Sequence, residues 1–373
     1  MIYLDYSATT KTNKEVLDTF IKVSNDFYGN PNSLHELGLN AKKLIDSASS
    51  QINSLLNIDK EIIYTSGASE SNNLAIKGIA FKYKNRGMHI ITTPLEHSSV
   101  SEPINYLQSL GYSVDYVELD KYGRVDLNCL KSLMRDDTIL VSINAVNSEL
   151  GILQPLKEIS KIVKKNKKCY FHSDITQAIG KVSIDISDID LVSFSAHKFF
   201  GIKGVGALIK NKNVEILPLI HGGKSTTIYR SGTPSTPLIA SISKALRLSL
   251  ENIDYKYEKV KILNDYIVEN LKQYDKVRIN SNKYSIPHIL NLSIIGAKPE
   301  TFTHALEEYN IYISTKSACA TSSESAAVYS VTKSHERAMS SVRISISYIT
   351  TKEEIDEFLK AFDICYKKLT NLR

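Results

Sequence analysis

Seven short β-rich runs alternate with amphipathic stretches over the first 210 residues, and this alternation restricts the fold more than any other feature. The stretches between the runs, such as "LKEISKIVKKN", place apolar residues at i, i+3 and i+4, which predicts helices. The predicted strands are "EIIYTS" (61–66), "HIITT" (89–93), "SVDYVEL" (113–119), "TILVSINAV" (138–146), "CYFHSD" (169–174), "LVSFSA" (191–196) and "VGALIK" (205–210). Largely apolar strands alternating with helices predict an α/β fold, with a mostly parallel seven-stranded sheet covered on both faces.

The pattern changes after residue 236. One long helical stretch over residues 236–273 is expected to connect two parts of the chain. The elements that follow are "KVRIN", "ILNLSI", a helix at 299–309, "IYIST", "SVRISIS" and a closing helix at 351–371. Strands and helices in that order predict a smaller α+β domain at the C-terminal end.

The composition is that of an ordinary globular protein, with 42% apolar and 23% charged residues among 373. The net charge of +6 arises from interspersed charges without a basic block, which argues against nucleic-acid binding. The N-terminus does not resemble a signal peptide, and no stretch reaches the ~18 apolar residues of a membrane span. Four scattered cysteines without CxxC spacing favour neither a disulfide framework nor a zinc site. We therefore expect a cytoplasmic protein of enzyme size that binds no metal, membrane or nucleic acid.

Polar residues gather where the predicted strands end, which is where open α/β sheets bind ligands. The strand at 61–66 runs into "TSGASESNN", in which Ser66 and Ser69 flank a glycine-led turn that opens a helix. Free N–H groups and hydroxyls at such a turn can form an anion site, most simply a phosphate site. A plain helix cap by Ser66 or Ser69 explains the same residues.

The strand at 169–174 ends in an acid, Asp174, with Gln177 three residues later. A carboxylate at the end of a buried strand is costly unless it has a cationic partner. The alternative is that Asp174 only caps a helix.

The strand at 191–196 runs into "SFSAHKFFG", which places Ser195, His197 and Lys198 between apolar residues. A desolvated lysine has a lowered pKa and can form a Schiff base with an aldehyde. Taken alone, a solvent-exposed lysine at a strand end is the simpler interpretation.

The three strand ends together make a more specific prediction than each does alone. A phosphate cradle, an acid for a pyridinium nitrogen and a Schiff-base lysine are what a protein supplies to hold pyridoxal phosphate (PLP). His97, in "PLEHSSV" after the strand at 89–93, adds a group that could stack on a pyridine ring and move protons. We therefore predict a PLP site at this edge of the sheet.

Nine motifs along nearly the whole chain resemble, in order, the landmarks of the NifS/IscS-type cysteine desulfurases. These are PLP enzymes of the class-V aminotransferase family with fold type I. The resemblance implies a large PLP-binding domain at 13–250 and a small α+β domain formed by 1–12 and 251–373. The motifs are "YLDYSATT", "FYGNPNSLHELG", "IIYTSGASESNNLAIKG", "LEHSSV", "HSDITQAIGK", "SFSAHKFFGIKGVGAL", "RSGTPS", "SACATSS" and "SVRISIS".

The resemblance also implies roles around the cofactor. Lys198 would bind PLP covalently, Asp174 would pair with the pyridine nitrogen, and His97 would stack on the ring. Gln177 would bond on the side of the ring oxygen. The residues implied for the phosphate are Ala68, Ser69, Ser195, His197 and, from the neighbouring subunit of a homodimer with shared sites, Thr233.

For the substrate, L-cysteine, the resemblance implies Arg343 as the bidentate partner of the carboxylate, with Asn30 assisting. Cys319, in the serine-rich stretch "STKSACATSSESAAVYS", falls at the position of the nucleophile. Its thiolate would take the substrate sulfur, leaving alanine and a persulfide, and His97 could deprotonate it. Such a sulfurtransferase would supply sulfur to an iron–sulfur scaffold or to a tRNA-thiolation enzyme.

The chain departs from the family pattern at several places. It has "VNSELG" where the family has two asparagines, so Asn147 is taken as the residue over the ring oxygen, with Ser148 as the alternative. The turn before "RSGT" is "HGGKSTTIY", and Lys316 interrupts the small residues before the cysteine. The segment after Cys319 lacks the leucine-rich helix expected there. These departures concern sulfur delivery more than core catalysis.

Three other functions fit parts of the sequence. A selenocysteine lyase would keep its activity without Cys319, and a weakened relative acting as a scaffold would bind PLP and a protein but release no sulfide. A nucleotide-binding oxidoreductase is the general α/β alternative. The stretch "GIKGVG" does not follow the GxGxxG order and comes late in the chain, which argues against it.

Overall fold

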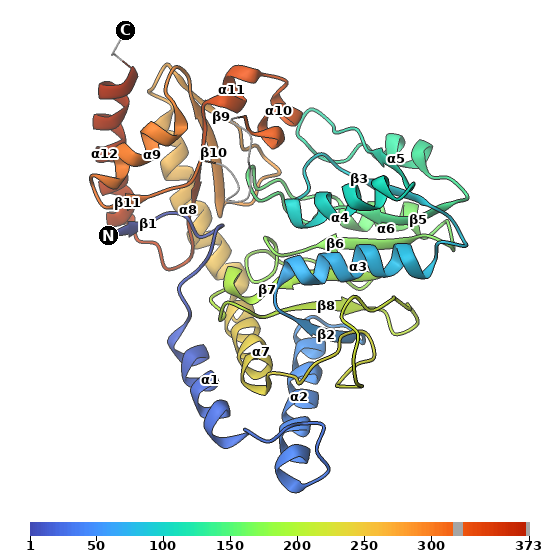
Figure 1. Ribbon diagram of the computed structural model, residues 1–373. Coiled ribbons are helices and arrows are strands. Elements are labelled where there is room, and N and C mark those ends of the chain that lie inside the picture. Colours follow the sequence, from blue (N-terminus) through green and yellow to red (C-terminus); the bar gives the residue numbers. More distant parts are fainter. Residues whose placement is uncertain (316–323, 371–373) are drawn as a thin grey trace.

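A seven-stranded sheet forms the centre of the protein, as the sequence predicts (Figure 1). The structure, a computed structural model, describes residues 1–315 and 324–370. The strand order is β2-β8-β7-β6-β5-β3-β4, and β8 runs antiparallel to both of its neighbours while the remaining pairs are parallel. The strands are β2 (Glu61–Thr65), β3 (His89–Thr92), β4 (Ser113–Tyr116), β5 (Thr138–Ser142), β6 (Tyr170–Asp174), β7 (Leu191–Ser195) and β8 (Gly206–Lys210). The predicted α/β class and its mostly parallel sheet are therefore confirmed.

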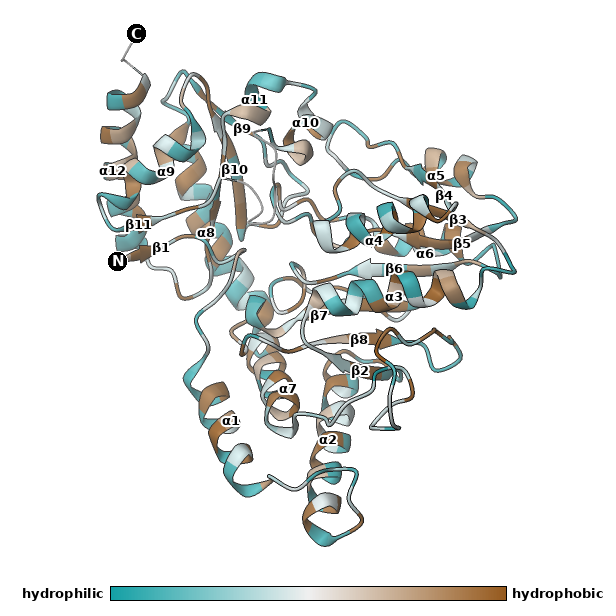
Figure 2. Cartoon of the chain, in the orientation of Figure 1, coloured by the Kyte–Doolittle hydropathy of each residue, from teal (hydrophilic) through white to brown (hydrophobic). Residues whose placement is uncertain are grey.

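Both faces of this sheet are buried, because consecutive strand residues enter two different cores. Ile90 and Leu208 pack on the side of α3 and α4, whereas Ile91 and Ile209 pack on the opposite side. This two-sided burial explains why the strands are nearly continuously apolar. In Figure 2, β8 is mainly brown, whereas the surface helices mix brown and teal. The helices of this part are α3 (Ala68–Lys82), α4 (Ser98–Ser109), α5 (Leu127–Leu133) and α6 (Leu156–Val163), and a 3-10 helix, η1 (Ala196–Lys198), follows β7.

The single connecting helix predicted over residues 236–273 is wrong, because the stretch forms two helices. They are α7 (Thr236–Leu250) and α8 (Ile253–Leu271), with Asn252 between them in the left-handed conformation at φ 52°. Asparagine tolerates this conformation better than most residues, and a left-handed residue ends a helix. Helices α1 (Lys14–Asp26) and α2 (Glu36–Leu55) both pack against α7, and α2 also contacts β2 through Ser49 Oγ and Tyr64 Oη (Figure 1).

The C-terminal part has its own sheet and its own core, as expected for an α+β unit. Its antiparallel sheet has the order β12-β10-β9, and β1 (Ile2–Tyr3) pairs in parallel with β11 (Ile311–Tyr312). Ile2 and Leu4 belong to the buried cluster of this part. The exact domain boundaries stay a prediction. The remaining elements are β9 (Val277–Ile279), β10 (Ile289–Ile294), α9 (Pro299–Glu307), β12 (Ser341–Ser345) and α12 (Lys352–Thr370).

Two short helices follow the segment 316–323, where the sequence suggested no leucine-rich helix. They are α10 (Ala326–Thr332) and α11 (His335–Met339). Val328 of α10 is buried against Leu150 and Ile152 of the large part. The apolar contact that leucines were expected to make is thus made by Val328 together with Ala327 and Ala338. No helix within residues 1–315 and 324–370 is long and apolar enough to cross a membrane.

Candidate active site

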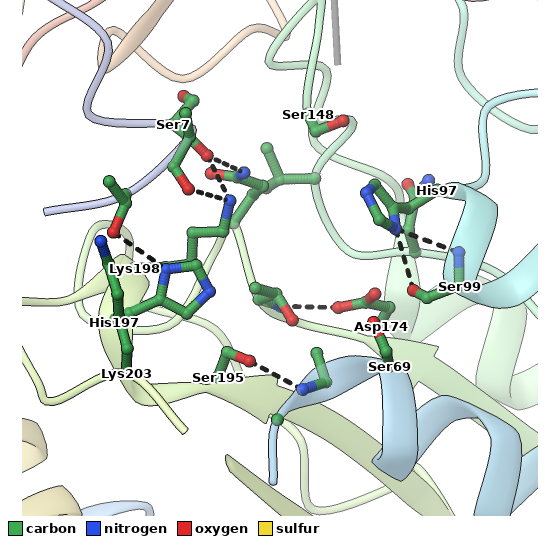
Figure 3. Close-up of a pocket in the computed structure, with 18 of the residues that line it drawn as sticks. Ser7, Ser69, His97, Ser99, Ser148, Asp174, Ser195, His197, Lys198 and Lys203 are labelled. Atoms are coloured by element: carbon green, nitrogen blue, oxygen red, sulfur yellow. Dashed lines mark hydrogen bonds between the residues drawn. The ribbon is translucent and has the colours of Figure 1, made fainter. Parts of the chain in front are cut away.

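A cavity of about 540 Å³ lies where several strands of the large sheet end. Its wall is formed by the turns that follow β2, β3, β5, β6 and β7, together with Ser7–Thr9 and Arg343 of β12. Figure 3 shows side chains from these separate elements pointing toward one space. The position agrees with the rule that open α/β sheets bind ligands beyond the carboxyl ends of their strands. The volume is in the range of small-molecule sites.

The turn between β2 and α3 brings the N-terminus of a helix to the cavity. Ala68 N–H donates to Ser195 Oγ at 2.7 Å, and Ser69 also lines the wall. The residue before the helix is Gly67, which provides no side-chain cap, so the plain cap by Ser66 or Ser69 is not observed. Gly206 of β8 lets the turn approach, because a Cβ there would lie 2.7 Å from Gly67 Cα and 2.5 Å from Phe194 O. The turn after β2 and the end of β7 thus meet where the sequence predicts an anion cradle, and that role stays a prediction.

Asp174, the last residue of β6, is 8% exposed and faces the cavity. Its Oδ2 accepts from Asn72 Nδ2 at 2.8 Å, and its Oδ1 accepts from Thr176 N–H at 2.9 Å. The bond to Oδ1 closes the local turn after β6, whereas the bond to Oδ2 ties the carboxylate to α3. Two buried acceptors beside it, Asn72 Oδ1 and Thr176 Oγ1, have no hydrogen-bond partner in the described part of the chain. This edge of the cavity is therefore suited to a polar ligand.

His97 begins α4 and lies on the same wall. Its Nδ1 accepts from Ser99 N–H at 3.1 Å and is 2.9 Å from Ser99 Oγ. Because burial lowers the pKa of His97, with Asp174 opposing the effect, the ring is neutral at pH 7. An Nδ1 that accepts a hydrogen bond assigns the proton to Nε2. Ser99 Oγ also accepts from Asn72 Nδ2 at 2.8 Å, so one amide links His97 to Asp174.

Lys198 ends η1, and its amine crosses to the N-terminal segment. Lys198 Nζ donates to Ser7 O at 2.5 Å and to Ala8 O at 2.8 Å. The adjacent His197 has Nδ1 3.1 Å from Thr9 Oγ1. Burial, followed by the charges of Lys198 and Lys203, lowers the pKa of His197 to about 4. The lysine is therefore a wall residue of the cavity, contrary to the solvent-exposed alternative.

Arg343 reaches the cavity from the C-terminal part and is 2% exposed. Its Nη2 donates to Asp5 Oδ1 at 2.8 Å and its Nη1 donates to Ser148 O at 3.0 Å. Its Nε has no partner among the described residues. Asp5 and Ser148 thus fix the two Nη atoms of the guanidinium, and each Nη carries a second N–H beyond the one used in these bonds.

Gln177 is also on the wall, and its amide is held at both ends. Its Nε2 donates to Ser7 O at 2.9 Å, and its Oε1 accepts from Lys181 Nζ at 2.5 Å. Together, Gln177, Lys198, Asp174, His97 and Arg343 surround one space.

Asn147 does not line the cavity, whereas Ser148 does. Both ends of the Asn147 amide already have hydrogen-bond partners. Nδ2 donates to Leu95 O at 2.9 Å, and Oδ1 accepts from the N–H groups of Glu149 and Leu150 in the same turn. Of the two residues considered for this position, the structure thus brings Ser148 to the cavity and not Asn147.

Two other predicted residues are not brought to this cavity within the described chain, and a third lies outside the described residues. Asn30 lies in the loop between α1 and α2, where its Oδ1 accepts from Asn32 N–H at 3.0 Å. Thr233 lines a separate cavity of about 250 Å³, which shares only Ser66 and Gly204 with the first. Cys319 lies outside the described residues, as does Lys316.

Several functional positions were missed by sequence reasoning. The segment Asp5–Thr9 contacts Arg343, Lys198 and His197, although only its motif was noted. Asn72 was also missed, and a buried asparagine within a helix was its only signal. Lys203 lines the wall near His197. Polar residues whose partners lie far away in the sequence carry no local signature.

Comparison with known proteins gives consistent matches over the full length. The model of the family "Aminotransferase class-V" matches residues 2–358. The "Cysteine desulfurase IscS" of Clostridium botulinum is 40% identical over 368 residues, covering 96% of this chain and 92% of that protein. A solved "NifS-like protein" is 35% identical with a TM-score of 0.92 and full coverage of both chains. A structure described as "SspA in complex with cysteine" is 31% identical with a TM-score of 0.82, covering 94% of this chain and 100% of that one.

Proposed function

This chain belongs to the class-V aminotransferase family and, within it, to the NifS/IscS-type cysteine desulfurases, and we propose that it converts L-cysteine to L-alanine with PLP as cofactor. The Cys319 thiolate would form an S–S bond to the substrate sulfur while the substrate Cβ–S bond breaks; the electron pair of that bond stays with the carbon and takes up a proton, so the products are alanine and a persulfide on Cys319. The observation that carries the proposal is the gathering of Lys198, Asp174, His97 and Arg343 around one cavity.

The residues of this cavity fit PLP by three observations. The helix N-terminus at Ala68 and Ser69, together with Ser195 and His197, offers hydrogen-bond donors to a phosphate. Asp174 offers a buried carboxylate at one edge of the cavity. Beside it, the buried oxygens Asn72 Oδ1 and Thr176 Oγ1 accept no hydrogen bond from the described residues. Lys198 supplies an amine opposite this edge (Figure 3). When bound, PLP supplies an electron-accepting ring that stabilises negative charge at the substrate Cα.

Asp174 would hold a proton on the ring nitrogen, and Asn72 orients its carboxylate. Lys198 would hold the cofactor aldehyde and, once released from it, would take the α-proton on Nζ. The carbonyls of Ser7 and Ala8, which accept from this amine, give it a second position away from the bond it leaves.

His97 would cover the ring and hold a proton at Nε2. Its Nδ1 already accepts from Ser99, so in this arrangement the neutral ring would donate a hydrogen bond from Nε2 to a group in the cavity. Arg343 would bind the substrate carboxylate through N–H groups left by Asp5 and Ser148.

The proposal includes a homodimer in which Thr233 and Asn30 complete the site of the neighbouring subunit. Both residues lie away from the cavity of their own chain, which is consistent with a role in the partner. An acceptor protein for the persulfide, such as an iron–sulfur scaffold or a tRNA-thiolation enzyme, and a cytoplasmic location complete the proposal.

One experiment tests the proposed function. The purified protein is loaded with PLP and given L-cysteine, and alanine and sulfide are measured for the wild type, Lys198→Ala and Cys319→Ser. We expect both products from the wild type in the presence of a thiol, and neither at a comparable rate from the variants. Alanine and sulfide from Cys319→Ser at the wild-type rate would rule out the persulfide on Cys319 and favour an activity that does not need this thiol, as in a selenocysteine lyase.

A further inference from the structure

Lys181 is a buried lysine behind the cavity that the proposed mechanism does not use. It is 8% exposed and lies in the tight turn after β6, next to Gly180, whose φ of 72° reverses the chain. A Cβ at Gly180 would lie 2.9 Å from Cβ atoms of Phe199 and Ser249, so the turn is closely packed against both. Burial of a lysine amine is costly, and nonpolar side chains of similar volume often replace buried charges without loss of stability.

No neighbouring negative charge within the described residues offsets the free-energy cost of burying the Lys181 amine. Burial lowers the pKa of Lys181 well below its ordinary value, and the positive charges of Lys198 and Arg343 lower it further. No acidic side chain forms an ion pair with it within residues 1–315 and 324–370. The neighbouring His288 is neutral, because burial and the charge of Lys181 lower its pKa to about 3.

The amine of Lys181 makes one specific contact, a hydrogen bond from Nζ to Gln177 Oε1 at 2.5 Å. The two ends of a glutamine amide have opposite hydrogen-bonding roles, so the partner of one end decides where the other points. A lysine that donates to Oε1 directs Nε2 to the opposite side, where it donates to Ser7 O at the cavity wall. The contact is between residues i and i+4 of one turn, so it does not depend on the distant N-terminal segment.

We propose that Lys181 is a positioning residue that fixes the amide of Gln177 with its N–H groups toward the cavity. This rests on the proposed function and on the role that the family resemblance implies for Gln177, whose amide would face the ring oxygen of PLP. An N–H donor aimed at an oxygen favours the ionised oxygen and so lowers the pH at which the bound cofactor changes its protonation. Without Lys181 the amide can rotate and present its carbonyl instead, which disfavours the ionised oxygen.

The test is a double-mutant cycle on the PLP-loaded protein, read by the pH midpoint of its visible absorbance and by the PLP concentration needed to reload the apoprotein. Lys181→Met removes the donor while keeping most of the volume, and Gln177→Ala removes the amide. We expect Lys181→Met to raise the midpoint by about one pH unit and to raise the PLP requirement about threefold to tenfold. In the Gln177→Ala background the same change should have no further effect on either quantity.

Two variants separate positioning from a general effect on packing. Lys60→Met removes another buried lysine, which donates to the carbonyls of Ile186 and Ile189, and should leave the midpoint unchanged. Lys181→Gln keeps a side-chain donor and should restore part of the wild-type midpoint. The thermal midpoint reports folding, and Lys181→Leu replaces Lys181→Met if the methionine variant does not fold.

Two results would overturn the inference. One is an unchanged absorbance midpoint in folded Lys181→Met. The other is an equal shift with and without Gln177. If the wild type takes up no PLP, the proposed function fails first and this inference fails with it, and the two failures are thereby distinguished.

Discussion

The Oδ1 atom of Asp5 accepts a hydrogen bond from Nη2 of Arg343 at 2.8 Å, across 338 positions in sequence. Asp5 belongs to the N-terminal segment, and Arg343 is a buried residue of β12. The carboxylate is not itself on the cavity wall, so it acts on the cavity only through the guanidinium. This pair makes one wall of the cavity dependent on both the N-terminal segment and the C-terminal part of the described chain.

We expect Asp5→Ala to raise KM for L-cysteine about tenfold with a smaller change in kcat, because the guanidinium loses a charged partner that fixes its orientation. Asp5→Asn, which keeps an acceptor, should have a smaller effect. Steady-state kinetics with increasing L-cysteine measures both. Asp59→Ala, which removes an exposed acid paired with Lys212, is the control, and an unchanged KM in Asp5→Ala would contradict the assignment.

Cys169 and Cys365 are poor competitors for the sulfur. Burial raises the pKa of Cys169 and of Cys365, so neither thiol forms a thiolate readily. After L-cysteine is added, persulfide labelling followed by mass spectrometry should find the modification on Cys319 alone. Cys129→Ser, which changes a half-buried thiol, should label like the wild type. A persulfide on Cys129 or Cys169 in the Cys319→Ser protein would refute this prediction.

Stability should fall in mild acid because two buried histidines are neutral in the folded protein. Burial lowers the pKa of His172 to about 4 and that of His288 to about 3, whereas both are near 6.5 in an unfolded chain. The unfolded state then binds more protons below pH 6.5, so this stability is present above pH 6.5 and is lost as the pH falls toward 4.

Urea unfolding at pH 7.5, 6 and 5 measures this loss, which should be on the order of a few kcal/mol over that range. His288→Gln should flatten the dependence, since the Nδ1 atom of His288 has no partner among the described residues to lose. His304→Gln, at an exposed position of α9, should retain the wild-type slope. An identical slope in His288→Gln would argue against this cause.

Gly206→Ala should destabilise the protein by about 1–3 kcal/mol and weaken PLP retention, because its Cβ would meet two backbone segments at the base of the anion cradle. Thermal unfolding and PLP release on dialysis measure the two effects. Gly223→Ala is the matched control, since a Cβ there has nothing within 4 Å. Equal thermal midpoints for the two variants would exclude this packing constraint.

Most of the large sheet could be predicted because most of its strands are buried on both faces. A strand of this kind forms a short run of mainly apolar residues, which can be recognised in the sequence. The three polar strand ends were also predictable, since Asp174, Ser195 and Lys198 interrupt apolar runs. The break at Asn252 was not, because one left-handed residue leaves the apolar spacing nearly unchanged. Nor could the sequence decide between Asn147 and Ser148, because that depends on Leu95 O, which takes the asparagine amide.

The hydrogen bonds from Lys198 to Ser7 O and Ala8 O have a consequence for biosynthesis. Ile2 and Leu4, which anchor these carbonyls, find their core among residues from Val260 to Tyr366 and pair with β11. Ribosomes make the chain from the N-terminus, so Ile2 and Leu4 have no complete core to join until residues up to Tyr366 have emerged. The large sheet can form earlier, but the amine of Lys198 gains its carbonyl partners only after this later part of the chain has been made.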